Sequence, residues 1–253
     1  MKQRIISGAI IAAITIAAIV VGSWFFFALC LFISVWGSYE FLSSRGKKIN
    51  WVEFALMLLF IILLNNFYDK AIPLVLGLLV CLFTLSVFDK EVSFDDICAT
   101  FIESVLLGFA VYYMNLIEHT NKMMFGYIVI IAYLTDVFAL FTGMKFGKHK
   151  LNERISPKKT IEGAIGGYIA GASISFIFAA IFKFFDLGVL RILVASLLLP
   201  AVSQVGDLAF SLIKRHYGVK DFSKLIPGHG GLLDRLDSLS FVLVIFGAIL
   251  SFL

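Results

Sequence analysis

The chain has 253 residues, of which 60% are hydrophobic and 15% are charged, and its formal net charge is +4. A soluble domain is about 45–50% apolar and about 25% charged. This composition excludes an ordinary soluble globular protein, and no nucleic-acid partner is expected. At about 20 apolar residues per spanning helix, the length allows roughly eight to ten membrane spans and leaves no room for a separate soluble domain.

Nine apolar segments follow one another along the chain, and each predicts a transmembrane helix. They are residues 5–21, 24–42, 51–67, 71–87, 97–117, 125–144, 160–182, 187–213 and 232–253. The expected fold is an all-α, polytopic membrane helix bundle. We divide it into an N-terminal transmembrane region, residues 1–120, and a C-terminal catalytic region, residues 121–253. No clear small-residue cleavage site follows the first segment, so we expect it to be retained as a span.

The distribution of basic residues provides a test of this span count. With nine spans, 17 of the 21 Lys and Arg residues fall on one side of the membrane. The other side has only Lys70, Lys122, Lys183 and Arg191. Because Lys and Arg concentrate in cytoplasmic loops, we expect the N-terminus and both long polar loops in the cytosol. The expected location is a bacterial cell membrane, with the chain passing through it several times.

Acidic residues inside apolar segments need a reason, because a carboxylate at membrane depth costs at least about 2.5–3.5 kcal/mol. Asp136 and Asp207 each lie eight or nine residues before a basic residue of a long polar loop. That spacing places both roughly 12–14 Å along a helix from the same surface and favours one shared site. The alternative is that each acid locks helix packing through a polar neighbour. For Glu40 and Glu103 we expect the simpler outcome, a side chain near a span end that reaches the interface.

The first long polar loop ends in the string Ser-Pro-Lys-Lys-Thr-Ile-Glu-Gly, residues 156–163. Thr160 can cap the helix that follows, and Glu162 lies in its first turn, where negative charge suits the helix dipole. Free backbone N–H groups at a helix start bind anions, and Lys158 and Lys159 add point charges for a phosphate. The alternative is an ordinary cap with a basic flank. The glycines that follow predict close helix packing.

The second polar loop, residues 211–237, is denser in polar residues. Asp207, Ser211 and Lys214 share one helix face at i, i+4 and i+7, and Asp234 and Asp237 share another at i and i+3. Carboxylates that converge with basic residues suit Mg²⁺ and phosphate, because Mg²⁺ prefers hard oxygen ligands. His-Gly-Gly at residues 229–231 allows the backbone to approach a phosphate closely, although a structural loop histidine fits equally well.

These residues resemble the signature of phosphatidate cytidylyltransferases, also called CDP-diacylglycerol synthases. The signature runs Ser-x-x-Lys-Arg, four residues, Lys-Asp, then Pro-x-His-Gly-Gly-x-x-Asp-Arg-x-Asp, and it is matched from Ser211 to Asp237. The string at residues 156–163 and the stretch from Asp136 to Gly147 are also similar to the family. Val-Phe-Ala follows Asp136 where the family has Thr-Gly-Ala. The resemblance covers residues 133–237.

The resemblance implies transfer of the cytidylyl group of CTP to phosphatidate, with Mg²⁺ as cofactor, giving CDP-diacylglycerol and pyrophosphate. A second metal ion and a homodimer are left open. Membrane lipids are the remaining expected partners. Two alternatives stay open: a CTP-dependent lipid kinase, and a lipid or ion transporter.

Three groups of residues are predicted to form the site. The metal ligands are Asp207, Asp234 and Asp237, with Asp136 and Asp221 as further candidates. The catalytic residues, which hold phosphates, are Lys214, Arg215, Lys220, Asp221 and Arg235. The substrate-binding residues are Ser156, Lys158, Lys159, Thr160, Glu162, Ser211, His229, Gly230 and Gly231. No general base is nominated, because a phosphate monoester with a second pKa near about 6 is already ionised at pH 7.

Overall fold

The computed structural model of the chain describes residues 2–184, 188–228 and 230–252, with side chains from Ile10 onward except Ile11. The helices are α1 (Lys2–Val21), α2 (Ser23–Ser44), α3 (Trp51–Asn66), η1 (Tyr68–Lys70), α4 (Ala71–Phe88), α5 (Phe94–Thr120), α6 (Lys122–Phe146), α7 (Ile161–Ile181), α8 (Val189–His216) and α9 (Leu233–Phe252). Two short strands, β1 (Lys150–Asn152) and β2 (Ser156–Thr160), separate α6 from α7. The fold is therefore nearly all-α rather than wholly α-helical, and each predicted apolar segment contains a helix.

The chain divides into two compact units. The first comprises Met1–Leu116 and Asp221–Leu233, and the second comprises Ile117–Lys220 and Asp234–Leu253. The second polar loop is thus shared, because its middle belongs with the N-terminal helices and its two ends belong to the second unit. The division into regions at residues 120 and 121 stays a prediction.

Seven helical segments of the described chain are long and apolar enough to cross a membrane. They are Ser23–Ser44, Tyr68–Phe88, Phe94–Thr120, Lys122–Phe146, Ile161–Ile181, Val189–His216 and Leu233–Phe252. Trp51–Asn66 is an apolar helix shorter than these, and Ala12–Val21 is the continuous stretch of the 20-residue α1 whose side chains are described. The prediction of several membrane passages is confirmed, and the count of nine is not reached by length and composition alone.

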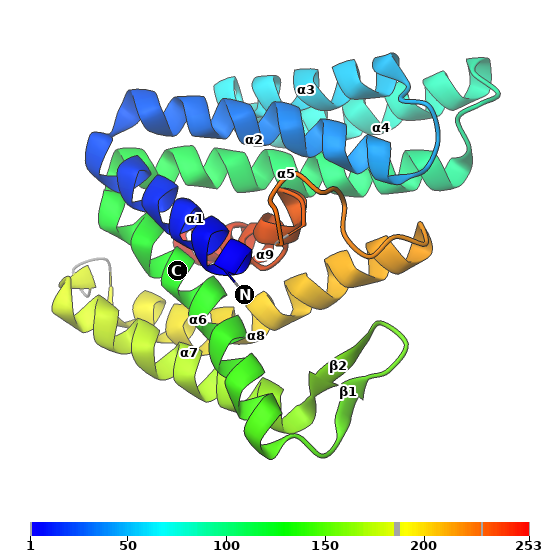
Figure 1. Ribbon diagram of the computed structural model, residues 1–253. Helices are drawn as coiled ribbons and strands as arrows, with labels where there is room; N and C mark the ends of the chain where they lie inside the picture. The colour runs from blue at the N-terminus through cyan, green and yellow to red at the C-terminus, as the bar shows by residue number, and fades with distance from the viewer. Residues whose placement is uncertain (1, 185–187, 229, 253) are drawn as a thin grey trace. The chain divides into compact units, whose positions relative to one another are not determined.

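The first unit is built on α2, α3, α4 and α5, which run side by side (Figure 1). Phe41, Met57, Leu64 and Leu107 are among its most fully buried side chains. Asn50 begins α3 as its N-cap, because the side-chain oxygen accepts hydrogen bonds from the backbone N–H groups of the first turn.

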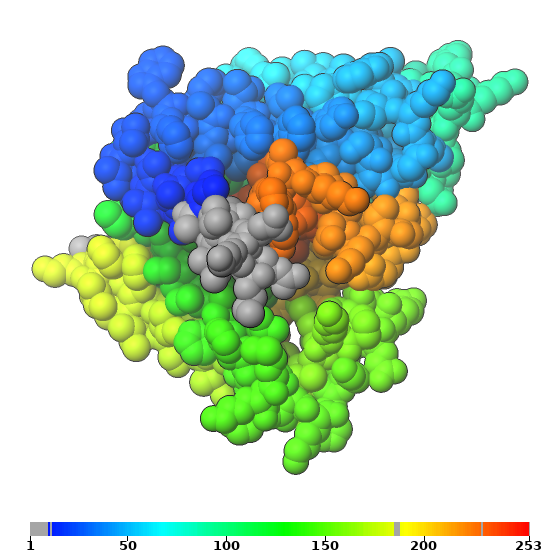
Figure 2. All heavy atoms as spheres, viewed as in Figure 1, coloured from blue at the N-terminus to red at the C-terminus, as the bar shows by residue number. Residues whose placement is uncertain are grey.

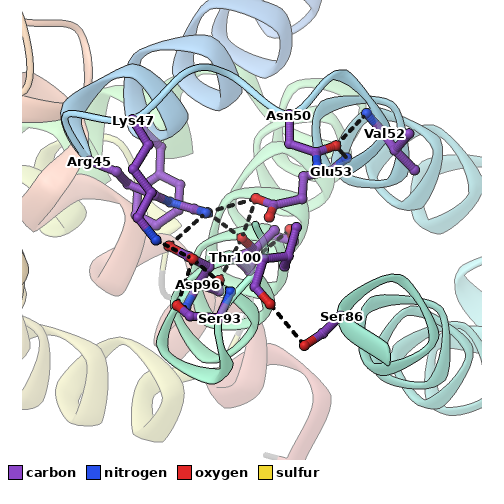
Figure 3. Close-up of polar contacts among 12 residues, drawn as sticks. Arg45, Lys47, Asn50, Val52, Glu53, Ser86, Ser93, Asp96 and Thr100 are labelled. Carbon is purple, nitrogen blue, oxygen red and sulfur yellow. Dashed lines mark hydrogen bonds and ion pairs between the residues drawn. The ribbon is translucent and has the colours of Figure 1, made fainter. Parts of the chain in front are cut away.

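A buried ion-pair network joins the ends of α2, α3 and α5 (Figure 3). Arg45 donates to Glu53 at 2.7 Å and to the hydroxyl of Thr100, and it lies 3.5 Å from Asp96. The side chains of Arg45, Glu53 and Asp96 are 5%, 3% and 4% exposed. Lys47 reaches the same Asp96 at 2.6 Å, and its own side chain is 53% exposed. One buried guanidinium therefore connects carboxylates from two neighbouring helices.

In the second unit, α6 and α7 pack closely because α7 presents glycine to its neighbour. A Cβ atom built on Gly163 would lie 2.6 Å from the carbonyl oxygen of Ala139, and one on Gly167 would lie 2.5 Å from the carbonyl oxygen of Thr135. Real Cβ atoms do not approach a backbone oxygen so closely, so the two helices can meet at this distance only while these positions remain glycine. The predicted close packing is confirmed.

We expect Gly167→Ala to destabilise the protein by about 1–3 kcal/mol, because the added methyl group forces α7 away from α6. Thermal unfolding of the detergent-purified protein measures the effect. Gly77→Ala is the matched control, since a Cβ atom there meets nothing within 4 Å in the middle of α4. Equal melting temperatures for the two variants would contradict this account of the α6–α7 contact.

The strands between α6 and α7 form an antiparallel hairpin in which Lys150 pairs with Thr160 and Asn152 with Ser156. The Asn152 side chain accepts a hydrogen bond from the Ile155 N–H at 3.2 Å and so stabilises the turn. Figure 2 shows the atoms of this hairpin at the surface, in light green at the lower right. The first polar loop therefore has regular structure and delivers Lys158, Lys159 and Thr160 to the start of α7.

Candidate functional site

A cavity of about 590 Å³ lies in the second unit where α6, the hairpin, α7 and α8 meet. Its polar lining residues are Asp136, Lys150, Lys158, Lys159, Thr160, Gln204 and Asp207. Gly143, Gly147 and Gly163 also line it, and their missing side chains leave room beside Thr160. The cavity thus combines acidic groups from two helices with basic groups from the hairpin.

An ion pair between Lys159 and Asp207 connects the hairpin to α8 across this cavity. The Lys159 ammonium donates to one carboxylate oxygen of Asp207, and the Ser211 hydroxyl donates to the other at 3.4 Å. Both charged side chains remain partly exposed, at 27% and 22%. The pair is therefore accessible to an incoming anion or cation, unlike a pair sealed in a core.

Asp136 and Asp237 are joined through one serine. The Ser238 hydroxyl donates to Asp136 at 3.1 Å, and the Ser238 N–H donates to Asp237 at 2.7 Å. The carboxylates of Asp136, Asp207 and Asp237 lie close enough to repel one another electrostatically. Ser238 therefore holds two of these three acids in place.

A second ion pair joins the end of α8 to the start of α9. The Lys214 ammonium donates to Asp234 at 2.6 Å, and the two side chains are only 9% and 3% exposed. Next to it, the Arg215 guanidinium donates to the carbonyl oxygens of Ile155 and Val219 at 3.4 and 3.0 Å. Tyr133 donates to the carbonyl oxygen of Arg235 at 3.1 Å. These contacts hold the ends of α8 and α9 to the hairpin and to α6.

The start of α7 has the cap that the sequence predicts. The Thr160 hydroxyl oxygen accepts a hydrogen bond from the Gly163 N–H at 3.1 Å. Glu162 lies in the first turn and accepts hydrogen bonds from the N–H groups of Lys148 and His149, at 3.0 and 3.2 Å, while its carboxylate lies 2.6 Å from the imidazole of His149. The carboxylate of Glu162 therefore fastens the turn after α6 to α7.

Carboxylate oxygens of the kind that Mg²⁺ prefers lie in and beside the cavity. Mg²⁺ takes hard oxygen ligands and usually only one or two protein carboxylates, while phosphates and water complete its octahedron. Asp136 and Asp207 line the cavity, and Asp237 is joined to Asp136 through Ser238. Among the described residues, no group of three or more His, Cys, Asp or Glu is placed to hold a metal ion. The residues present therefore fit Mg²⁺ only with one or two carboxylates as ligands, the phosphates of a substrate and water supplying the rest.

Comparison with known proteins agrees with this acidic and basic arrangement. Residues 2–253 match the family model described as "Cytidylyltransferase family". The chain belongs to the cytidylyltransferase family.

Individual relatives in the family are similar along most or part of their length. A Bacillus subtilis (strain 168) protein named phosphatidate cytidylyltransferase is 32% identical over 96% of this chain and 95% of its own length. Proteins of the same name from Staphylococcus saprophyticus and Staphylococcus aureus (strain COL) are each 39% identical over 60% of this chain and 58% of their own length. The similarity to the first relative therefore includes both units.

In this cytidylyltransferase, the second unit brings together the largest share of the predicted site. The cavity contains Asp136, Asp207, Lys158, Lys159 and Thr160. Asp136 and Asp237 are also linked through Ser238, so the predicted shared site of Asp136 and Asp207 extends to α9. The alternative in which each acid only locks helix packing accounts less well for acids that line a cavity.

Other predicted residues lie outside this cavity. Ser156 pairs with Asn152 in the hairpin, and Lys220 and Asp221 are exposed where the chain passes from one unit to the other. Gly230 and Gly231 belong to the first unit, and His229 lies outside the described residues. The roles predicted for these residues stay predictions.

Glu40 and Glu103 were expected to reach the membrane interface, and for both this expectation is wrong. Glu40 does not reach the interface, since it is 1% exposed and accepts hydrogen bonds from Ser223, Leu232 and Leu233. Glu103 is also only 1% exposed, so the same expectation is wrong for it. A carboxylate at membrane depth is costly wherever it lies. This cost singled out Asp136 and Asp207, and it is the signal by which these two buried acids could also have been recognised.

Ser238 is a site residue that the sequence analysis did not consider. It follows Asp237 directly, and its hydroxyl and its backbone N–H serve two different carboxylates. A serine beside an acid is common in any sequence. Ser238 can be recognised as part of the site only from the fold, which brings α6 and α9 together.

Proposed function

We propose that this chain transfers the cytidylyl group of CTP to phosphatidate and so produces CDP-diacylglycerol and pyrophosphate. The observation that carries the proposal is the 32% identity over 96% of the chain to a protein named phosphatidate cytidylyltransferase. The cavity of the second unit supports it, because the acids and lysines that line it suit a reaction between two phosphate compounds.

The reaction requires two anions to meet. An ionised phosphate oxygen of phosphatidate attacks the α-phosphorus of CTP. A new P–O bond forms while the bond to the bridging oxygen breaks, and that electron pair leaves with pyrophosphate. Lys158 and Lys159 hold phosphate oxygens against their mutual repulsion. Since the nucleophile is ionised near pH 7, the chain need not supply a general base.

Mg²⁺ is the proposed cofactor, with Asp207, Asp237 and Asp136 as the residues that would hold it. When bound, Mg²⁺ stabilises the negative charge that develops on transferred and leaving phosphate oxygens. Asp234 is paired with the buried Lys214, so within this structure it serves first to hold α8 and α9 together.

The proposed location is a bacterial cell membrane with both polar loops in the cytosol. The bias of 17 of the 21 Lys and Arg residues to one side, obtained with nine spans, supports this orientation. In this arrangement α1 and α3 also cross the bilayer, phosphatidate arrives from the lipid phase and CTP arrives from the cytosol. The homodimer stays a prediction, as does the second metal ion.

The decisive experiment incubates purified protein with phosphatidate micelles, Mg²⁺ and CTP labelled at either the α- or the γ-phosphorus. We expect label from the α-position alone to enter a lipid product. Label from the γ-position would instead indicate a CTP-dependent lipid kinase. Absence of any labelled lipid would contradict the proposed function.

A further inference from the structure

The loop between α8 and α9 is fastened to a carboxylate on α2. Glu40 accepts hydrogen bonds from the Ser223 hydroxyl, from the Leu232 N–H at 3.0 Å and from the Leu233 N–H at 2.6 Å. All of these residues belong to the first unit, although the loop is more than 180 residues away along the chain. The three contacts hold Ser223 and the two residues at the start of α9, whose loop is drawn in orange in Figure 1.

Gly231 leaves the space that the Glu40 carboxylate occupies. A Cβ atom built on Gly231 would clash with both carboxylate oxygens and the carboxyl carbon of Glu40. Gly231 does not have a positive φ angle, whereas Gly230 has a φ of 83°. The two neighbouring glycines are therefore needed for different reasons: Gly230 for its backbone conformation, and Gly231 for the space that the Glu40 carboxylate occupies.

The charge of Glu40 is compensated by hydrogen-bond donors. No ion pair with Lys, Arg or His is formed by Glu40 among the described residues. The backbone N–H groups of Leu232 and Leu233 lie at the start of α9, where the helix dipole favours negative charge. Hydrogen bonds to a buried carboxylate are short and strong, and removing the acceptor leaves these donors unsatisfied. The loop, the start of α9 and the Glu40 carboxylate therefore have to be correctly placed together for all three hydrogen bonds to form.

We propose that Glu40 is a positioning residue for the cytidylyl transfer: it fixes Ser223 and the start of α9. This inference rests on the proposed function. Leu233, whose N–H Glu40 accepts, directly precedes Asp234 in the chain and lies four residues before Asp237. A displacement of the start of α9 also displaces both acids, because they lie on the same helix. Glu40 touches no reacting atom in this role, and it acts through the backbone that carries them.

Glu40→Gln tests the proposal, because it preserves size while it removes the charge and one acceptor. We expect kcat to fall about 10- to 100-fold, since a misplacement of about 1 Å at a reacting centre has that effect. Apparent KM values for CTP and phosphatidate are expected to change less than kcat, because the phosphate-holding lysines of the hairpin are untouched. Wild-type kcat in Glu40→Gln, or a loss confined to KM, would overturn the inference.

Glu103→Gln is the matched control. Glu103 is equally buried on the neighbouring helix α5, and neither of its carboxylate oxygens has a hydrogen-bond partner among the described residues. The amide substitution there removes no contact with the loop, so we expect kcat within about twofold of the wild type, as for a substitution that breaks no native bond. A loss equal to that of Glu40→Gln would show that any buried acid of this unit has the same effect, and would overturn the inference.

A double substitution tests the contact itself. Gly231→Ala alone should lower the melting temperature, because its methyl group collides with Glu40. In the Glu40→Ala background that collision is gone, so Gly231→Ala should lower the melting temperature little further. Additive losses of stability would contradict the contact. If Glu40→Gln fails to accumulate, Ser223→Ala removes a single donor from the same cluster, and an unchanged kcat there would overturn the proposal. Absence of CDP-lipid from the wild-type protein would instead overturn the proposed function, and this inference with it.

Discussion

Asp207→Asn is expected to lower kcat/KM for CDP-diacylglycerol formation by about 10²–10³-fold, the loss typical when one group that stabilises developing charge is removed. Asp207 has two roles that the substitution weakens together. It binds the Lys159 ammonium, and it is one of three carboxylates that repel one another beside the cavity. Initial rates with varied CTP and phosphatidate measure the effect. Glu153→Gln, which removes an exposed acid at the hairpin turn, is the control and should retain wild-type rates.

The two roles of Asp207 can be separated by titration with Mg²⁺. If Asp207 holds Mg²⁺, Asp207→Asn raises the Mg²⁺ concentration that gives half-maximal activity. Lys159→Met breaks the same ion pair from the other side and should lower activity while that Mg²⁺ concentration stays the same or falls. Identical Mg²⁺ curves for wild type and Asp207→Asn would exclude Asp207 as a metal-holding residue. A rise in Lys159→Met alone would assign the effect to the ion pair.

Hydropathy located every α-helix of the described chain but misplaced helix ends that are charged. The fifth apolar segment was expected from residue 97, yet α5 begins at Phe94, with Asp95 and Asp96 in its first turn. The eighth was expected to end at residue 213, yet α8 continues through Lys214, Arg215 and His216. Acids at a helix start and bases at a helix end suit the helix dipole, so these turns are helical although they are polar. An apolar pattern alone does not detect them.

The candidate site was predictable where its residues are close in sequence. Ser211 follows Asp207 by one helical turn, and the Thr160 cap is a local signal; both contacts form as expected. Contacts between distant residues were not predictable. Lys159 and Asp207 are 48 residues apart, and Glu40 and Leu233 are 193 apart. One sequence gives the face on which a residue lies, but it does not say which helix packs against that face.

The largest effect on stability is expected from Arg45, whose replacement by Met should lower the free energy of unfolding by about 3–5 kcal/mol. The substitution conserves most of the side-chain volume but leaves Glu53 buried without the guanidinium, while Asp96 keeps its contact with Lys47. The uncompensated buried carboxylate of Glu53, rather than a lost attraction, accounts for the size of the effect. Equilibrium unfolding of the detergent-purified protein measures it.

Lys47→Met provides the comparison, because Lys47 binds the same Asp96 carboxylate with a side chain that is half exposed. Solvent already screens that ammonium, so its loss should cost only about 0–1 kcal/mol. Adding Glu53→Gln to Arg45→Met should recover part of the loss, since the carboxylate left without its guanidinium is then removed. If Arg45→Met and Lys47→Met were equally mild, the network would be a surface feature. If the second substitution made Arg45→Met worse, stranded charge would not be the cause. The buried guanidinium is then best understood as the group that allows α3 and α5 each to bring an acid to the same place beside α2 (Figure 3).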